Sequence, residues 1–258
     1  MDQLGTGAFL GVSKANYHLS GIILSEIVYN SRVSEEWHHH ANPHCSLILE
    51  GGNLEHRQHR QQDALPGQLL RYAAGEVHRN LHTLHPSRNL NLELEPTFFK
   101  TYDLPEMTWE TIAEHDLQLA VLKLYHACSM QEGTLAHTSL LSLWGQQPER
   151  PGKGLPAWAV RIRELLQDQW DTPFTLASLS AQVGVHPVTV SRYFPLYFHC
   201  TLGEYLRKIK VAHSLALVRN KENSLTNIAL QCGFYDQSHF IRSFRLYTGY
   251  RPGVFRKL

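Results

Sequence analysis

Three consecutive histidines in the first half of the chain are the residues best suited to chemistry. They are His38, His39 and His40. Alternate side chains of an extended strand point to the same face, so His38 and His40 would share one side of a sheet. Imidazoles placed together in this way are donors that suit zinc, iron, nickel or copper. Of the 17 histidines in the chain, 13 precede Leu155, which places this chemistry in the first half.

The elements around these histidines are predicted to be short antiparallel strands. Brief apolar runs separated by polar turns extend from Tyr17 to about Leu94, and Gly-Gly at 51–52 and Pro-Gly at 66–67 mark two of the turns. Several strands at this spacing predict a small barrel or jelly roll, which can hold one small ligand inside. Residues 1–16 show little pattern, and we expect them to form a loose arm.

This region resembles the two sequence motifs of the cupin family. The matched positions are His38, His40, Gly51, Gly67, Gly75 and His78. The chain departs from the motifs at His44, where cupins often carry Glu, and at Ala73, where Pro is usual, and no Gly precedes His38. The resemblance implies a metal site at His38, His40, His44 and His78, because His in place of Glu retains a donor. The alternative is that these side chains line the barrel, or a pocket for an organic ligand, without a metal.

The pattern changes to helical from about Trp109. One helix beginning near Asp116 would carry an apolar face: Leu117, Ala120, Val121, Leu124 and Cys128. A second helix would hold Leu140, Leu141, Leu143 and Trp144. These two apolar faces fit either a dimer interface or packing against the chain's own barrel. Residues 148–156 lie in a segment rich in proline and glycine, which predicts an interdomain linker.

A second group of candidate functional residues lies in the stretch 224–255. Its first apolar run recurs at helical spacing: Leu225, Ile228, Ala229 and Cys232. Gly233 can leave that helix with a positive φ, and Asp236 is a suitable N-cap for the next helix. The second helix would bury Phe240, Phe244 and Tyr247 along one side. This is the pattern of a helix-turn-helix unit, whose second helix offers its free side to the major groove of DNA.

The same pattern is predicted upstream. A short helix closed by Gly184 precedes a helix that Pro187 opens, and Val190 and Phe194 correspond to Phe240 and Phe244. Between the two units, Thr201 to Glu204 form a capping box that begins a helix of about 18 residues, or about 27 Å. That length suits two units that enter successive major grooves, which lie about 34 Å apart.

The C-terminal hundred residues resemble the AraC/XylS family of bacterial transcription regulators. The matched positions are Ile228, Ala229, Gly233, Phe234, Asp236, Gln237, Ser238, Phe240, Arg242, Phe244, Gly249 and Pro252. Regulators of this family commonly carry a cupin-like N-terminal domain, so the two resemblances support each other. The chain departs from the family at His186, where Ser is frequent, at His199, which replaces a common Gly, and at Pro195, which we expect to shorten or bend its helix.

Eight residues on the free sides of the two second helices are predicted to contact DNA: Val188, Thr189, Ser191, Arg192, Gln237, Ser238, His239 and Arg242. Arg192 and Arg242 suit guanine, with a phosphate as the alternative, whereas Gln237 suits adenine and Val188 a thymine methyl group. Further phosphate contacts are expected from Arg245, Arg251, Arg256 and Lys257. In the connecting helix, Arg207, Lys208 and Lys210 are expected to face outward.

The charge of the chain is divided unequally. From Leu155 onward there are 13 Lys and Arg against 6 Asp and Glu, a net charge of +7, whereas the preceding part has 11 against 17, a net charge of −6. A basic second domain that binds a polyanion explains this asymmetry. The four cysteines are scattered, which favours reduced thiols over a disulfide framework. No export signal or membrane span is predicted, so we expect a cytoplasmic protein.

These patterns together predict an α+β chain. We expect a cupin-like β-barrel (jelly roll) at 1–108, a helical and possible dimerisation segment at 109–147, a linker at 148–156, and an all-α domain with two helix-turn-helix units at 157–258. The expected function is a ligand-responsive transcription activator, a homodimer that binds double-stranded promoter DNA and senses a small-molecule effector or a metal, with RNA polymerase as a further candidate partner. We do not expect an enzyme. The alternative is a metal-dependent cupin enzyme fused to a DNA-binding domain.

Overall fold

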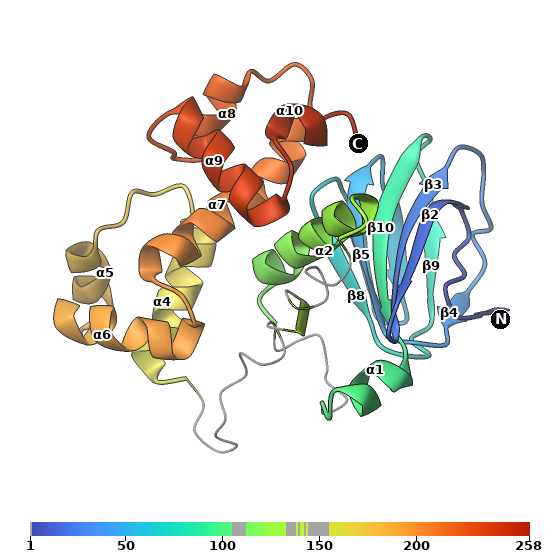
Figure 1. Cartoon of the computed structure of the whole chain (residues 1–258), viewed down its shortest axis with the longest axis horizontal. Helices are drawn as coiled ribbons and strands as arrows, with labels where there is room; N and C mark the ends of the chain where they lie inside the picture. Colours follow the sequence, from blue (N-terminus) through green and yellow to red (C-terminus); the bar gives the residue numbers. More distant parts are fainter. Residues whose placement is uncertain (1, 105–111, 133–137, 139, 142, 144–154) are drawn as a thin grey trace. The chain divides into compact units, whose positions relative to one another are not determined.

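The computed structural model describes residues 2–104, 112–132, 138, 140, 141, 143 and 155–258 (Figure 1). The chain divides into two compact units, Met1–Leu140 and Leu141–Leu258. The predicted linker lies outside the described residues up to position 154. Of the second predicted helix, Leu140, Leu141 and Leu143 are described and helical, and Trp144 lies outside the described residues. Within the described part of the chain, no helix combines the length and the apolar character needed to cross a membrane.

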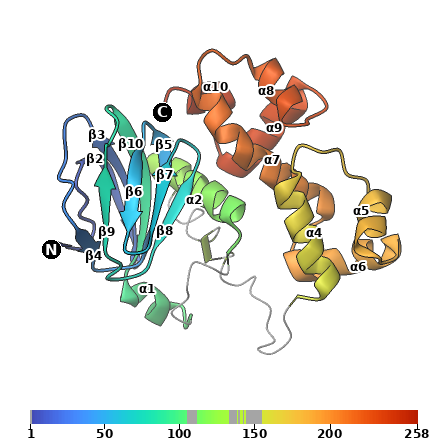
Figure 2. The same ribbon diagram turned by 180° about the vertical axis from the view of Figure 1, so that it is seen from behind.

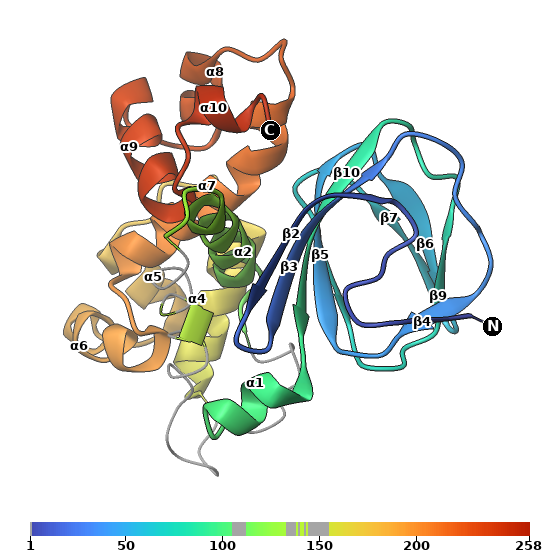
Figure 3. The same cartoon turned by 45° about the vertical axis from the view of Figure 1, so that its right-hand side comes forward.

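The first unit contains two five-stranded sheets that face each other (Figure 3). One sheet has the order β1-β4-β9-β6-β7, formed by Asp2–Leu4, His38–His40, His78–Leu81, Asn53–Arg57 and Arg60–Ala64. The other has the order β2-β3-β10-β5-β8, formed by Val12–Leu19, Ile22–Tyr29, Ser87–Leu94, His44–Glu50 and Leu69–Tyr72. Among the described residues no strand of one sheet pairs with a strand of the other. The predicted jelly-roll architecture is therefore present as a sandwich that is not closed into a continuous barrel.

The strands β3, β5 and β10 are buried on both faces, although alternation was expected for β10. A helix explains part of this burial, because α2 (Glu114–Ser129) lies against the outer face of this sheet (Figure 3). The hydroxyl of Tyr125 in α2 donates to the buried carboxylate of Glu26 in β3. The side-chain amide of Gln118 donates to the carbonyl oxygen of Gly67 at 2.9 Å. Helix α2 therefore packs against its own sheet, which is one of the two roles considered for it.

The N-terminal residues do not form a loose arm. Residues Asp2–Leu4 form β1, which pairs in parallel with β4 so that Leu4 lies opposite His40. Beyond this strand the ring of Phe9 packs at 4.9 Å from the ring of His40. Pairing with β4 provides hydrogen-bond partners for the backbone of β1. Sequence periodicity could not predict this strand, because three residues are too few to show alternation. A short helix, α1 (Pro96–Thr101), follows β10.

The second unit is helical without strands over its described residues 155–258, as predicted. Its elements are α4 (Ala157–Asp168), α5 (Leu176–Val183), α6 (Pro187–Phe198), α7 (Leu202–Arg219), α8 (Leu225–Gln231), α9 (Gln237–Thr248) and α10 (Pro252–Phe255). Helix α7 runs between α4–α6 on one side and α8–α10 on the other (Figure 2). Its capping box is present, because Thr201 and Glu204 bond reciprocally at its first turn. The 18 residues of α7 span about 27 Å, which confirms the predicted spacer.

Two expectations about the helices are wrong in detail. Helix α6 runs through Pro195 to Phe198, so it is not shortened, and a bend at Pro195 stays a prediction. Tyr247 is half-buried, and Thr248 takes the buried position near the end of α9, where its hydroxyl donates to the carbonyl of Phe244 at 2.7 Å.

Candidate functional site

Two helix-turn-helix units in the second domain share the same construction. Helices α5 and α6 are joined through Gly184 with φ 68°, and helices α8 and α9 through Gly233 with φ 67°. The buried pairs are Val190 with Phe194 and Phe240 with Phe244, each at most 1% exposed. Burial of one side of α6 and α9 leaves the opposite side of each helix free, as a recognition helix requires.

Local caps fix the start of each recognition helix. The side chain of Asp236 accepts a hydrogen bond from the backbone N–H of His239 at 2.6 Å, as predicted for an N-cap. At the equivalent place in the first helix-turn-helix unit, the Nδ1 atom of His186 accepts a hydrogen bond from the backbone N–H of Val188 at 3.3 Å. An imidazole nitrogen thus performs the capping role that a serine hydroxyl would otherwise have.

The eight predicted DNA-contacting residues lie on these two helices. Val188, Ser191 and Arg192 of α6 and Gln237, Ser238 and Arg242 of α9 are exposed, while Thr189 and His239 are half-buried. The guanidinium carbon of Arg192 lies 5.6 Å from the ring centre of Tyr193. Both arginines are therefore in positions from which they can reach a base edge or a phosphate.

Two of the predicted contacts already have partners within the protein. The side-chain oxygen of Gln237 accepts from the hydroxyl of Thr226 at 2.7 Å. A paired contact to adenine uses that oxygen as acceptor, so Gln237 must share or release this bond to make it. The ring of His239 packs edge-on against Phe234 at 5.3 Å, which restricts its rotation.

Two of the cationic side chains make hydrogen bonds within the protein. The guanidinium of Arg256 donates to the carbonyl oxygens of Val218 at 2.8 Å and Asn223 at 2.7 Å, so it joins the C-terminus to the end of α7. The ammonium of Lys210 donates to the carbonyl of Gly233 at 2.8 Å. We expected a phosphate contact at Arg256 and an outward side chain at Lys210. These hydrogen bonds were not predicted, because the carbonyl groups that accept them are distant in sequence.

Several exposed residues remain available for phosphates, and one apolar pair was missed. Arg245, Arg251 and Lys257 are exposed. Leu196 is 65% exposed and Leu246 is 61% exposed, and each follows an arginine of the predicted contact set by one helical turn. The i, i+4 spacing from Arg192 and Arg242 is the signal that would have placed these leucines on the free sides.

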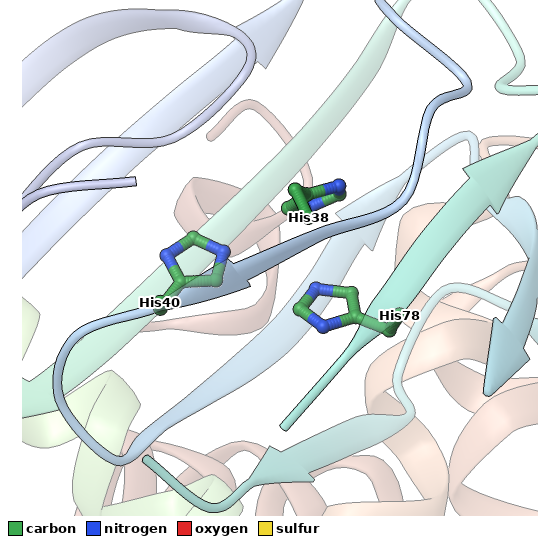
Figure 4. A group of neighbouring side chains, drawn as sticks. All are labelled: His38, His40 and His78. Carbon is green, nitrogen blue, oxygen red and sulfur yellow. The ribbon is translucent and has the colours of Figure 1, made fainter. Parts of the chain in front are cut away.

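The histidine site lies in the N-terminal unit, Met1–Leu140, and is formed by two strands. His38 and His40 are buried on β4 with the half-buried His39 between them, as strand alternation predicts. His78 on β9 lies directly opposite His38 in the antiparallel register. The three rings gather between these strands (Figure 4), and one nitrogen from each forms a group whose members all lie within 4.8 Å of one another.

Hydrogen bonds select the tautomer of two of these rings. The Nδ1 atom of His38 lies 3.1 Å from the carbonyl oxygen of Glu36, and the Nδ1 atom of His78 lies 2.9 Å from that of Glu76. A carbonyl oxygen only accepts, so in the neutral ring Nδ1 carries the proton and Nε2 keeps its lone pair. This is the arrangement that orients histidine ligands in metal sites.

Burial keeps these rings neutral. Burial lowers the pKa of His38, and burial together with repulsion from His78 and His38 lowers the pKa of His40 to about 3. Burial is also the main cause that lowers the pKa of His78 to about 4. The unprotonated imidazole is the form that binds a metal, so the chemistry of the three donors fits a divalent transition metal.

His44 lies beside this group but outside it. Its ring centre is 4.2 Å from that of His40 and 6.3 Å from that of His78. The ring stacks on Tyr72 at 4.3 Å, and the hydroxyl of Tyr72 donates to the buried carboxylate of Glu55. The structure thus brings three of the four predicted ligands together and places the fourth against an aromatic wall.

The cavity at the histidines has a volume of about 20 Å³. That is room for about one water molecule or one ion, whereas sites for organic molecules usually have several hundred Å³. Two acidic side chains of this unit that could act as catalytic bases have partners: Glu76 accepts from Arg57 at 2.6 Å, and Glu93 accepts from Asn42 at 2.7 Å. In its described form, the cavity suits an ion better than a substrate.

A larger open cleft of about 980 Å³ lies elsewhere in the first unit. Its walls come from the turn between β4 and β5, the turn between β6 and β7, the segment from β8 toward β9, and α1. Tyr72 lines both this cleft and the histidine cavity. The cleft has enough volume for an organic ligand.

Comparison with known proteins finds a family match within the second domain and several similar transcription regulators. A family model described as a helix-turn-helix domain matches residues 179–258. The HTH-type transcriptional regulator GbdR of Pseudomonas aeruginosa is 29% identical over 91 residues, which are 35% of this chain and 25% of that protein. The HTH-type transcriptional activator RhaR of Klebsiella pneumoniae is 31% identical over 85 residues, which are 33% of this chain and 30% of that protein.

A longer match includes part of the first unit. The uncharacterized HTH-type transcriptional regulator YpdC of Escherichia coli is 24% identical over 184 residues, which are 69% of this chain and 59% of that protein. The matched segments thus cover 25% to 59% of these three relatives, and the likeness to GbdR and RhaR is confined to about a third of this chain.

Proposed function

We propose that this chain, which belongs to the AraC/XylS family through its C-terminal DNA-binding domain, activates transcription in response to a ligand held by its N-terminal domain. Its DNA partner would be a double-stranded promoter. The proposal includes a homodimer. It also includes a contact with RNA polymerase, since an activator must recruit or reposition the polymerase. The relative RhaR, described as a transcriptional activator, supports this direction of regulation.

The observation that carries the DNA-binding part is the repeated construction around α7. Two recognition helices with free outer sides are separated by a capped helix of about 27 Å. One turn of DNA measures about 34 Å, so a single chain can place α6 and α9 in successive major grooves. The net charge of +7 from Leu155 onward favours association with the phosphates.

The test begins with selection of bound sequences from a random duplex library, because the operator must come from the protein itself. Hydroxyl-radical footprinting of the selected duplex should then show two protected patches about one helical turn apart on the same side of the DNA. A single patch, or patches on opposite sides, would exclude simultaneous insertion of both helices.

For the sensing part, the proposal assigns His38, His40 and His78 as the residues that would hold a divalent zinc, iron, nickel or copper ion. Three buried neutral imidazoles, two with their tautomer fixed, and a cavity of about 20 Å³ support this assignment. His44 would be a ligand only after a change of its ring position. A bound ion would link β4 to β9 and add positive charge between the sheets.

A small organic effector is the second candidate, and the open cleft of about 980 Å³ favours it. Elemental analysis and mass spectrometry of the same purified sample separate the two. One bound metal per chain with no organic ligand supports the ion, whereas a stoichiometric organic molecule supports the cleft. Chemical turnover of such a molecule would favour the alternative of a metal-dependent cupin enzyme joined to a DNA-binding domain.

A further inference from the structure

The two helix-turn-helix units differ in charge, which becomes clear when the second domain is divided at the start of α7. Residues 155–200 contain three Lys and Arg and three Asp and Glu, so their net charge is zero. Residues 201–258 contain ten against three, a net charge of +7. Attraction to phosphates falls off within about a Debye length, so this attraction arises mainly from α7 and the second unit.

The recognition helix of the first helix-turn-helix unit carries less charge than α9 and differs from it at three positions. Residues 176–200 contain a single Lys or Arg, which is Arg192. Where α9 carries Gln237, Ser238 and Arg245, the equivalent positions of α6 carry Pro187, Val188 and Pro195. On its free side the first helix-turn-helix unit therefore combines one exposed apolar side chain, Val188, with the hydrogen-bonding side chains of Thr189, Ser191 and Arg192.

Val188 is the residue of α6 that offers an alternative. It is the second residue of the helix, and the N-terminal part of a recognition helix is the part that contacts base edges. Its side chain is 62% exposed, and a β-branched side chain in a helix is held almost entirely in one rotamer. The hydrogen bond from its backbone N–H to His186 fixes the helix end that carries it.

A rigid, exposed apolar group at this position has one apolar partner in the major groove, the 5-methyl group of thymine. We infer that the first helix-turn-helix unit recognises thymine through Val188. This side chain packs on the thymine methyl group, one helical turn from the base or phosphate that Arg192 contacts. The first helix-turn-helix unit then adds an apolar contact to that of Arg192, whereas the equivalent position of the second unit carries the polar Ser238. This inference rests on the proposed DNA-binding function.

The test uses the selected operator and the full-length protein. The half-site of the first unit is assigned as the patch that Arg192→Ala loses from the footprint. Each thymine in that half-site is replaced in turn by deoxyuridine, which removes only the methyl group. One replacement should weaken binding of the wild-type protein about fourfold, the effect of about one buried methyl or methylene group.

Val188→Ala should bind the unmodified operator about fourfold more weakly and should lose no further affinity with deoxyuridine at that position. Leu196→Ala is the matched control, since this leucine is equally exposed on the same side of α6 but two turns away. It should keep the full response to deoxyuridine. The dependence of affinity on salt should be unchanged in Val188→Ala, because valine neutralises no phosphate.

Two results would overturn the inference while leaving DNA binding intact. They are wild-type binding that ignores every deoxyuridine in the first half-site, and a Val188→Ala variant that keeps the wild-type response. Failure to obtain any sequence-specific complex would instead overturn the proposed function, and the inference with it.

Discussion

Arg242 and Arg256 lie 14 positions apart near the C-terminus and have different surroundings. The side chain of Arg242 is exposed on the free side of α9. The guanidinium of Arg256 is half-buried and donates to two backbone carbonyls, those of Val218 and Asn223. A guanidinium with free donors can form the paired contact to guanine, whereas one whose donors are engaged contributes to stability.

Replacing Arg242 by alanine should lower the affinity for the selected operator by about 1–3 kcal/mol, because a paired contact to guanine, or a charged contact to a phosphate, is lost. The midpoint of thermal unfolding should stay within a degree or two of the wild type, as for other exposed positions. Quantitative gel-shift titration and circular dichroism measure the two effects. Unchanged affinity and footprint would remove Arg242 from the contact set.

Arg256→Ala is the matched control at the same scale. It leaves two carbonyl oxygens without a charged partner, so the free energy of unfolding should fall by about 1–3 kcal/mol. Base preference should not change. A variant that unfolds like the wild type but binds DNA less tightly would show that Arg256 contacts phosphate after all.

His78 tests the metal assignment at residue scale. His78→Ala removes one of three imidazole ligands, so metal affinity should fall at least about 10–100-fold, the loss known for removal of an outer partner alone. Competition titration against a chromogenic chelator measures it. His59→Ala is the control, because this exposed histidine lies in the turn between β6 and β7. Equal metal affinity in both variants would contradict the site.

At the scale of elements, the two glycine turns decide how each recognition helix is set against its partner helix. Gly184 and Gly233 have nearly the same φ, 68° and 67°, a region that side chains other than glycine rarely adopt. Their surroundings differ. A Cβ on Gly184 would meet nothing within 4 Å, whereas one on Gly233 would lie 2.9 Å from the Nζ atom of Lys210.

Gly184→Ala should therefore cost about 1 kcal/mol of stability, from the positive φ alone. Gly233→Ala should cost about 1 kcal/mol more, because Lys210 must move and its bond to the Gly233 carbonyl is weakened. Urea unfolding of both variants measures the difference. In a Lys210→Met background the two glycine variants should become equivalent, and a persistent difference would contradict this explanation.

At the scale of the whole molecule, charge is separated between the two units of the chain. The part before Leu155 has a net charge of −6 and the part from Leu155 onward +7. The acidic N-terminal part gains nothing from approaching phosphates, so attraction to DNA arises from the part from Leu155 onward. A ligand in the first unit changes DNA binding only if it binds the two arrangements of the protein with unequal affinity.

Operator affinity should fall steeply with salt. Each phosphate neutralised contributes about −0.9 to the slope of log affinity against log salt, so several contacts give a slope of several units. Arg245→Ala and Arg251→Ala should each reduce the slope by about one, as measured by fluorescence anisotropy at several salt concentrations. A slope near zero in the wild-type protein would contradict binding dominated by phosphate contacts.

The amino-acid sequence by itself determined the features that depend on neighbouring residues. The glycine turns, the Asp236 cap, the Thr201–Glu204 capping box and the buried pairs of α6 and α9 were all predicted, because caps and helical periodicity act within a few positions. The strands around β3, β5 and β10 were predicted from their apolar runs, although their burial on both faces was not.

Only the tertiary structure decided which distant residues meet. The cupin resemblance grouped His38 with His78, but their pairing across 40 positions comes from the register of β4 and β9, which local sequence does not specify. The inward turn of Lys210 and Arg256, the packing of α2 on β3 and the volume of about 20 Å³ left between the sheets have the same origin. Each depends on contacts between segments that are far apart along the chain, and such contacts produce no periodic pattern in the sequence.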